Sequence, residues 1–174
     1  MTRPTQRPTG VERVWAEDRL IVSKTDAKGI ITYANSTFCE VAQYTEAELM
    51  GQPQNVVRHP DMPRCIFKLL WDTIQTGQEL FAYMVNLAKT GDHYWVFAHV
   101  TPTFDQGMRI IGYHSSRRVP RREAVDAVVP LYRDLTAIEA RAPSPKQGLE
   151  ESTSALNAVL QAKGVAYDEF ALSL

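Results

Sequence analysis

Hydrophobic and polar positions change their spacing several times along the chain, and each change marks a predicted element. Leu20–Val22 and Ile30–Tyr33 are short apolar, β-branched runs on either side of a turn that ends in Gly29, a pattern typical of a β-hairpin. From residue 35 to about residue 50 the spacing becomes helical. Thr45 and Glu48 form a capping-box pattern there, which predicts that a second short helix begins at this point.

The clearest helical stripe comes next. Ile66, Leu69, Leu70 and Ile74 recur at helical intervals and predict a helix over about residues 62–76 that is ended by Gly77. Three strand-like segments follow it, with turn residues between them. They cover Leu80–Ala88, His93–Thr101 and Met108–Ser115, and they predict an antiparallel meander.

The ends of the chain predict helices outside this central part. Helical spacing returns over residues 121–141, where Pro130 would either kink the helix or start a new one. We expect an N-terminal extension with a short helix at residues 11–18 and a loosely ordered start. The predicted organisation is an extension (1–18), a central domain (19–118), a flanking helix (119–142), a linker (143–150) and a helix with a tail (151–174).

The order of these elements predicts an α+β fold. A hairpin, short helices, a longer helix and three antiparallel strands together give one five-stranded antiparallel sheet with helices on one face. A pocket between the sheet and its helices is a common place for a small-molecule site. We therefore look for binding residues between these two layers.

Composition narrows the class of protein. The hydrophobic content of 44% is enough for a core, and the net charge of −1 gives no reason to expect nucleic acid or an acidic membrane surface as a partner. Cys39 and Cys65 stand alone, which fits a reducing compartment better than a disulfide framework. No apolar run is long enough for membrane insertion, and the first residues lack a signal-peptide pattern. These features predict a soluble cytoplasmic protein.

Candidate chemistry is concentrated in the run Asn55–Pro63, where a cationic, an imidazole and an acidic side chain stand on a backbone stiffened by prolines. The donors of Arg58 suit a phosphate or a carboxylate, and His59 could sense the reduction state of a bound cofactor. Asp61 could bind a ligand or cap the following helix, and Asn35 could do the same for its own helix.

Other kinds of site have less support. Four histidines leave haem as an option, because a haem site needs one histidine that faces the pocket. His93 and His99 share a strand face with Trp95. No pair of histidines has the spacing of a zinc site. Trp71 and Trp95 are better explained as core residues than as cofactor contacts. No nucleophile motif or phosphate-binding loop is present, so we predict no catalytic residues, no metal ligands and no enzymatic activity.

Several stretches resemble a known family. The order of strands and helices is that of a PAS sensor domain, which would make residues 19–118 the PAS domain. From about Leu20 to Leu135 the chain is similar to the N-terminal PAS domain of bacterial aerotaxis receptors. The stretches that carry the similarity are Ile31–Phe38, Gly51–Pro53, Val57–Pro63, Gly91–Val96 and Val129–Tyr132.

The resemblance implies a cofactor and a role. That family binds FAD in the PAS pocket and reports cellular redox state to a downstream signalling module, such as a chemoreceptor or a kinase. The positions that would contact the flavin are Asn35, Arg58, His59, Asp61 and Asn86. One family tryptophan is replaced by Leu80, and the aromatic side chains that could substitute for it are Phe81, Tyr83 and Trp95.

Two alternatives to a flavin sensor remain at this point. Leu80 could have emptied the pocket, which would leave a cofactor-free PAS adaptor for protein contacts. A histidine that faces the pocket would instead favour a haem-based gas sensor. We find no membrane anchor or long signalling hairpin in the sequence, so we expect output through a partner protein or through a homodimer, with the terminal helices as the route.

Overall fold

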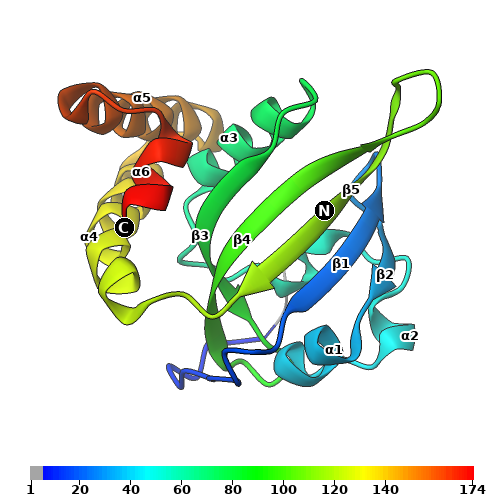
Figure 1. Cartoon of the computed structure of the whole chain (residues 1–174). Coiled ribbons are helices and arrows are strands. Elements are labelled where there is room, and N and C mark those ends of the chain that lie inside the picture. The colour runs from blue at the N-terminus through cyan, green and yellow to red at the C-terminus, as the bar shows by residue number, and fades with distance from the viewer. Residues whose placement is uncertain (1–5) are drawn as a thin grey trace.

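A five-stranded antiparallel sheet forms the centre of the computed structural model, which describes residues 6–174 (Figure 1). Its strands lie in the order β2-β1-β5-β4-β3, and every neighbouring pair is antiparallel. The strands are β1 (Ile21–Asp26), β2 (Ile31–Ala34), β3 (Leu80–Leu87), β4 (His93–Phe104) and β5 (Ile110–Arg118). The predicted hairpin, meander and α+β class are confirmed.

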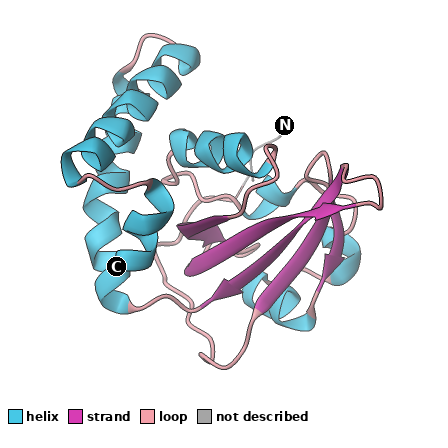
Figure 2. Cartoon of the chain, turned by 45° about the horizontal axis from the view of Figure 1, so that its top comes forward, coloured by secondary structure: helices cyan, strands magenta, loops and turns pink. Residues whose placement is uncertain are grey.

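Strand alternation divides the side chains between two faces of this sheet. Asn86 pairs with Tyr94, and these residues lie on what we call the first face. Val85 pairs with Trp95 on the opposite, second face. The elements between β2 and β3 are α1 (Ser36–Ala42), α2 (Glu46–Leu49), the 3₁₀ turn η1 (Gln54–Val57) and α3 (Arg64–Ile74). Figure 2 shows the twisted sheet with helices against it.

The short helices begin where the sequence predicts. Asn35 is the N-cap of α1, and its side-chain oxygen accepts a hydrogen bond from the backbone N–H of Phe38. Thr45 and Glu48 form the predicted capping box at the start of α2. These side chains satisfy backbone donors that would otherwise lack partners at the helix ends.

The C-terminal region is more helical than predicted. It comprises α4 (Arg122–Arg141), which continues through Pro130 as one helix, then α5 (Pro145–Lys163) and α6 (Tyr167–Ser173). The predicted linker at 143–150 is therefore wrong. Ser144 caps α5 by accepting from the Gln147 N–H, and Pro145 occupies its first turn, where a proline loses no helical hydrogen bond. The predicted tail forms α6.

The predicted helix at residues 11–18 is also wrong. Residues 11–13 pair with the start of β4, where the Arg13 N–H donates to the His93 carbonyl at 2.7 Å and the His93 N–H donates to the Val11 carbonyl at 2.9 Å, and residues 17–18 form a turn. These backbone groups gain sheet-like partners instead of helical ones. The prediction of a loosely ordered start falls partly on residues 1–5, which lie outside the described part of the chain.

The hydrophobic core is continuous from the sheet into the C-terminal helices. It includes Ile21 of β1, Phe38 of α1, Tyr94 of β4, Leu135 of α4 and Leu156 of α5, all of them buried. The helices after β5 are therefore packed parts of the domain. Within residues 6–174, none of the helices combines the length and the apolar character needed to cross a membrane.

Candidate functional site

A cavity of about 130 Å³ lies between α3 and the first face of the sheet, and we call it the first cavity. Its apolar and aromatic wall includes Val57, Phe67, Leu70, Trp71, Ile74, Met84, Val100 and Tyr113. Its polar side chains are Ser23, Thr25, Lys28, Gln54, Asn55, Arg58, Asn86, Ser115 and Arg117. The volume is below the range of about 300–1,000 Å³ that is typical of small-molecule sites, so a large ligand would have to widen the cavity.

Arg58 and Asn86 are the two predicted site residues that line this cavity. Arg58 follows η1, and its Nη2 donates to the Met62 carbonyl at 3.2 Å. Its guanidinium also lies over the ring of Phe67, 4.3 Å from the centroid. Its backbone forms an isolated antiparallel bridge with Asn86, whose side chain is buried. The bridge places both residues at the same end of the cavity.

Arg117 lines the first cavity, and the sequence analysis did not single it out. It is 4% exposed, and its Nη2 donates to the Ser23 hydroxyl at 2.6 Å. The guanidinium carbon lies 4.9 Å from the centroid of the Phe38 ring. Its Nη1 has no hydrogen-bond partner, and no carboxylate forms an ion pair with it, among residues 6–174. Burial lowers the pKa of Arg117 to about 10, so the side chain remains positively charged at neutral pH.

The unused donor of Arg117 points to the kind of ligand that the first cavity would take. A buried N–H without an acceptor costs free energy, which a ligand oxygen or nitrogen could recover. Ser23, which accepts from Arg117, donates in turn to the Gln54 side-chain oxygen at 3.1 Å. The cavity thus joins an apolar wall to a cationic, hydrogen-bonding corner, an arrangement that suits a flat ligand with a polar edge.

Asn35 has a structural role in this fold. Its Oδ1 accepts from the backbone N–H groups of Phe38 and Val22, each at 3.0 Å. Its Nδ2 donates to the Leu20 carbonyl at 2.8 Å. These bonds tie the start of α1 to β1. Asn35 is not among the residues that line the first cavity.

His59, Asp61 and Trp95 border a different, second cavity of about 550 Å³, between the second face of the sheet and α4. Trp95 borders this cavity because side chains alternate along the strand, which places Trp95 on the opposite face from Asn86. Its ring centroid lies 6.2 Å from that of Tyr132. His59 is buried, and its Nδ1 accepts from the Asp61 N–H at 3.1 Å. Burial lowers the pKa of His59, the charge of Asp61 opposes this shift, and His93 adds to it.

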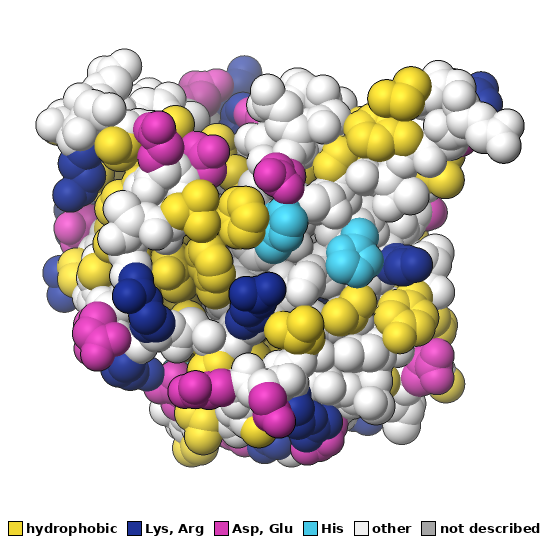
Figure 3. Space-filling model, in the orientation of Figure 1, with side chains coloured by type: hydrophobic (Ala, Val, Ile, Leu, Met, Phe, Trp, Pro, Cys, Tyr) yellow, Lys and Arg dark blue, Asp and Glu magenta, His cyan; other side chains and the backbone are white. Residues whose placement is uncertain are grey.

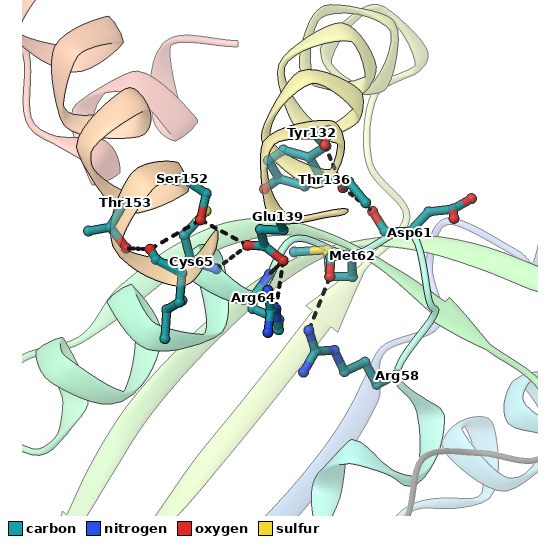
Figure 4. Close-up of polar contacts among 11 residues, drawn as sticks. Arg58, Asp61, Met62, Arg64, Cys65, Tyr132, Thr136, Glu139, Ser152 and Thr153 are labelled. Carbon is teal, nitrogen blue, oxygen red and sulfur yellow. Dashed lines mark hydrogen bonds and ion pairs between the residues drawn. The ribbon is translucent and has the colours of Figure 1, made fainter. Parts of the chain in front are cut away.

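The prediction that Asp61 caps α3 is wrong. The N-cap position of that helix is Pro63, which offers no side-chain bond, and the Asp61 side chain is 82% exposed. Glu139 of α4 takes the capping role, because its carboxylate accepts from the backbone N–H groups of Arg64 and Cys65, both at 3.0 Å (Figure 4). The start of α3 is capped by a carboxylate, as predicted, but the carboxylate belongs to a residue that is distant in sequence.

The aromatic residues near Leu80 also lie away from the first cavity. Leu80 is buried and pairs with Val100, which lines the cavity. Phe81 lies on the second face, where its ring stacks on that of His99 with centroids 4.1 Å apart. Trp71 of α3 is the tryptophan that lines the first cavity, and its ring meets that of Tyr113 edge to face.

Histidine and metal chemistry find little support at the first cavity. None of the residues that line it is a histidine. Within residues 6–174, no group of three or more histidine, cysteine, aspartate or glutamate side chains is placed to hold a metal ion.

Comparison with known proteins agrees with the family resemblance seen in the sequence. Residues 21–114 match the family model described as PAS fold. The chain is 45% identical over 122 residues to the aerotaxis receptor of Escherichia coli (strain K12), a match that covers 70% of this chain and 24% of the receptor. It is 30% identical over 115 residues to the nitrogen fixation regulatory protein of Klebsiella pneumoniae, which covers 66% of this chain and 23% of that protein. The chain thus matches about a quarter of the length of these curated relatives.

Solved structures show the same fold. The dark structure of the blue-light photoreceptor Aureochrome1 LOV matches with a TM-score of 0.57 at 20% identity, and the match covers 63% of this chain and 82% of that one. At this level of identity the likeness is one of fold.

Proposed function

The chain belongs to the PAS family, and on this premise we propose that it is a signalling sensor that binds FAD in the first cavity and reports redox state or oxygen to a partner protein. The observation that carries the cofactor assignment is the buried Arg117, whose Nη1 has no protein partner within residues 6–174. The similarity to an aerotaxis receptor over 70% of the chain supports the sensor role.

The residues of the first cavity fit a flavin. The apolar wall with Trp71 would pack on the flat ring system, and Arg117, Asn86 and Gln54 offer donors and acceptors for its polar edge. Arg58 would hold an oxygen of the ribityl chain or the pyrophosphate. When bound, FAD supplies a centre that accepts and releases electrons reversibly. Asn86 and Arg117 would then adjust their hydrogen bonds to the charge at that centre, and we propose that this adjustment starts the signal.

The partner in this proposal is a downstream signalling protein, such as a chemoreceptor or a kinase, with a homodimer as the working unit. The matched relatives are a receptor and a regulatory protein, which favours a binding and signalling role over an enzymatic one. The second face is a possible contact surface, since it carries mostly hydrophobic and uncharged side chains over β4 and β5, with histidines among them (Figure 3).

A cofactor-free adaptor is the second candidate, and two observations favour it. The cavity measures about 130 Å³, and Leu80 stands where the resemblance predicts a tryptophan. Haem has less support than either, because no histidine lines the first cavity.

Titration with FAD, followed by absorbance and by quenching of flavin fluorescence, tests the cofactor assignment. We expect the wild-type protein to bind and Arg117→Met to bind at least about tenfold more weakly, because a hydrogen bond to a charged group contributes about 1.5–3 kcal/mol. Arg118→Met is the matched control, since Arg118 is the exposed neighbour on the same strand. Equal affinity in both variants would contradict the role of Arg117.

The colour of the purified protein distinguishes the flavin sensor from the haem sensor and the cofactor-free adaptor. Purification from cells supplied with riboflavin and a haem precursor should give a yellow protein. A protein without a visible chromophore that also fails to bind added FAD would favour the adaptor. A Soret band would favour haem.

A further inference from the structure

The carboxylate of Glu139 joins three helices. Its Oε2 accepts from the backbone N–H of Arg64 at 3.0 Å and from the Arg64 Nε at 2.9 Å. Its Oε1 accepts from the Cys65 N–H and from the Ser152 hydroxyl, both at 3.0 Å. Glu139 belongs to α4, Ser152 to α5, and the other donors to the start of α3 (Figure 4). We call these four residues the Glu139 cluster.

Burial and the dipole of α3 both stabilise the hydrogen bonds of the Glu139 cluster. The Glu139 side chain is 7% exposed, and all four of its hydrogen bonds are charge-assisted. It lies at the N-terminus of α3, where the helix dipole favours a negative charge. Close packing of α5 adds to the constraint. A Cβ at Gly148 would lie 2.8 Å from the Glu139 carbonyl oxygen and 3.1 Å from Arg64 Nη2, so only glycine fits there.

The segment between Arg58 and Arg64 connects the cluster to the first cavity. At one end, Arg58 lines the cavity and donates to the Met62 carbonyl. In the middle, the Asp61 carbonyl accepts from the Thr136 hydroxyl of α4 at 3.2 Å. At the other end, Arg64 is held by Glu139. Pro60 and Pro63 restrict the backbone between these points.

We propose that the Glu139 cluster is the coupling element that transmits the state of the first cavity to α4 and α5. A ligand group that binds the Arg58 guanidinium competes with the Met62 carbonyl for its donors. Movement of that carbonyl shifts the start of α3 and with it the two backbone donors that Glu139 accepts. The balance between the bonds to α3 and the bond to Ser152 then changes, and α5 responds. The coupling to a flavin rests on the proposed function, whereas the mechanical link does not.

Amide hydrogen exchange of α5 in the full chain without cofactor tests the link in a double-mutant cycle of Arg58→Ala and Glu139→Gln. Glutamine keeps the shape of Glu139 and removes its charge. We expect Glu139→Gln to speed exchange in α5 at least about tenfold, because the amide nitrogen cannot accept and the two charge-assisted hydrogen bonds to one carboxylate oxygen are lost. Arg58→Ala should speed it in the wild-type background and add nothing in the Glu139→Gln background. Phe67→Leu removes the ring beneath Arg58 and replaces Arg58→Ala if that variant does not fold.

Glu150→Gln is the matched control, because it removes the same charge from an exposed position of α5 and should leave exchange there unchanged. Additive effects of Arg58→Ala and Glu139→Gln would overturn the proposal, as would unchanged exchange after Arg58→Ala. In a second arm, added FAD should alter exchange in α5 of the wild type but not of Glu139→Gln. Bound FAD with no change in α5 of the wild type overturns the coupling. Absence of FAD binding refutes the proposed function alone, and the mutant cycle then decides the coupling.

Discussion

At the scale of single residues, two buried ionic side chains have opposite surroundings. Glu139 accepts four hydrogen bonds, including one from a cationic partner, whereas Arg117 has no carboxylate partner and one donor nitrogen, Nη1, without an acceptor among the described residues. A satisfied buried charge contributes to structure, but an unpaired one costs stability. On the proposed function, the unpaired charge of Arg117 serves ligand binding at a cost in stability.

This trade-off gives a testable contrast for Arg117→Met. Methionine fills a similar volume without a charge to desolvate, so we expect the free energy of unfolding without cofactor to stay unchanged or to rise by about 1 kcal/mol. FAD affinity should fall in the same variant. Urea unfolding followed by circular dichroism measures the first quantity. A loss of more than about 2 kcal/mol would indicate that the guanidinium mainly supports the fold through Ser23 and Phe38.

His59 predicts a pH dependence. Burial lowers its pKa below the ordinary value of 6.5, so the unfolded chain binds more protons than the folded one at pH values between the two. Stability from this group is therefore complete above pH 6.5 and is lost as the pH falls through the folded pKa. Protonation at Nδ1 would also break the bond from the Asp61 N–H.

The variant His59→Asn isolates this contribution, because asparagine keeps a hydrogen-bond acceptor close to the position of Nδ1. At pH 8 it should be less stable than the wild type, and this gap should narrow as the pH falls below 6.5, the ordinary value for the group. Thermal unfolding over a series of pH values measures the gap. A gap that stays constant across the series would show that His59 does not titrate with folding.

At the scale of helices and strands, side-chain caps determine where most helices begin. The caps of α1, α2 and α5 come from residues next to the helix, Asn35, Thr45 and Ser144. The cap of α3 comes from Glu139, more than seventy positions further along the chain. Local caps can be predicted from sequence, but a distant one depends on tertiary packing.

Asn35 shows how a cap can be separated from a cofactor contact. We expect Asn35→Ala to lower the free energy of unfolding by about 1–2 kcal/mol, because it removes the cap of α1 and the tie to Leu20 and Val22. FAD affinity of the folded variant should stay within about twofold of the wild type, well below the tenfold change that follows from 1.4 kcal/mol. Calorimetry and a flavin titration measure the two effects. Lost affinity with normal stability would restore the flavin role that the family resemblance implies.

Strand alternation also shows where prediction from sequence stops. The hairpin, the meander and the α3 stripe follow from local spacing, and the structure confirms them. Which predicted residues share a face depends on strand register, which placed Asn86 and Trp95 on opposite sides of the sheet. Arg117 was missed because polar residues after Ser115 made the last strand look shorter than it is. The segment 143–150 resembles a linker in sequence because it contains two prolines and a serine, but Ser144 caps α5 and Pro145 begins it.

At the scale of the whole molecule, the sheet and the C-terminal helices share one core. Tyr132 of α4 donates its hydroxyl to the Tyr83 carbonyl of β3 at 2.7 Å and lies 2.9 Å from the Tyr167 hydroxyl of α6. Both hydroxyl groups are buried, and burial raises the pKa of each tyrosine, so both stay protonated at neutral pH. Because these contacts cross from the sheet to the last helix, we expect α4, α5 and α6 to unfold together with the PAS core.

This shared core makes a prediction for ligand binding. FAD at about one hundred times its dissociation constant should add about 2.7 kcal/mol to the free energy of unfolding. For a chain of 174 residues that corresponds to a rise of about 5–10 °C in Tm. The rise should appear in a single calorimetric transition and should occur in full in Arg118→Met. In Arg117→Met at the same FAD concentration it should fall to about half or less, because tenfold weaker binding leaves a gain of about 1.4 kcal/mol. A separate low-temperature transition that FAD does not move would mean that the C-terminal helices unfold independently. Coupling of the first cavity to α5 through Glu139 would then lack the rigid connection that it requires.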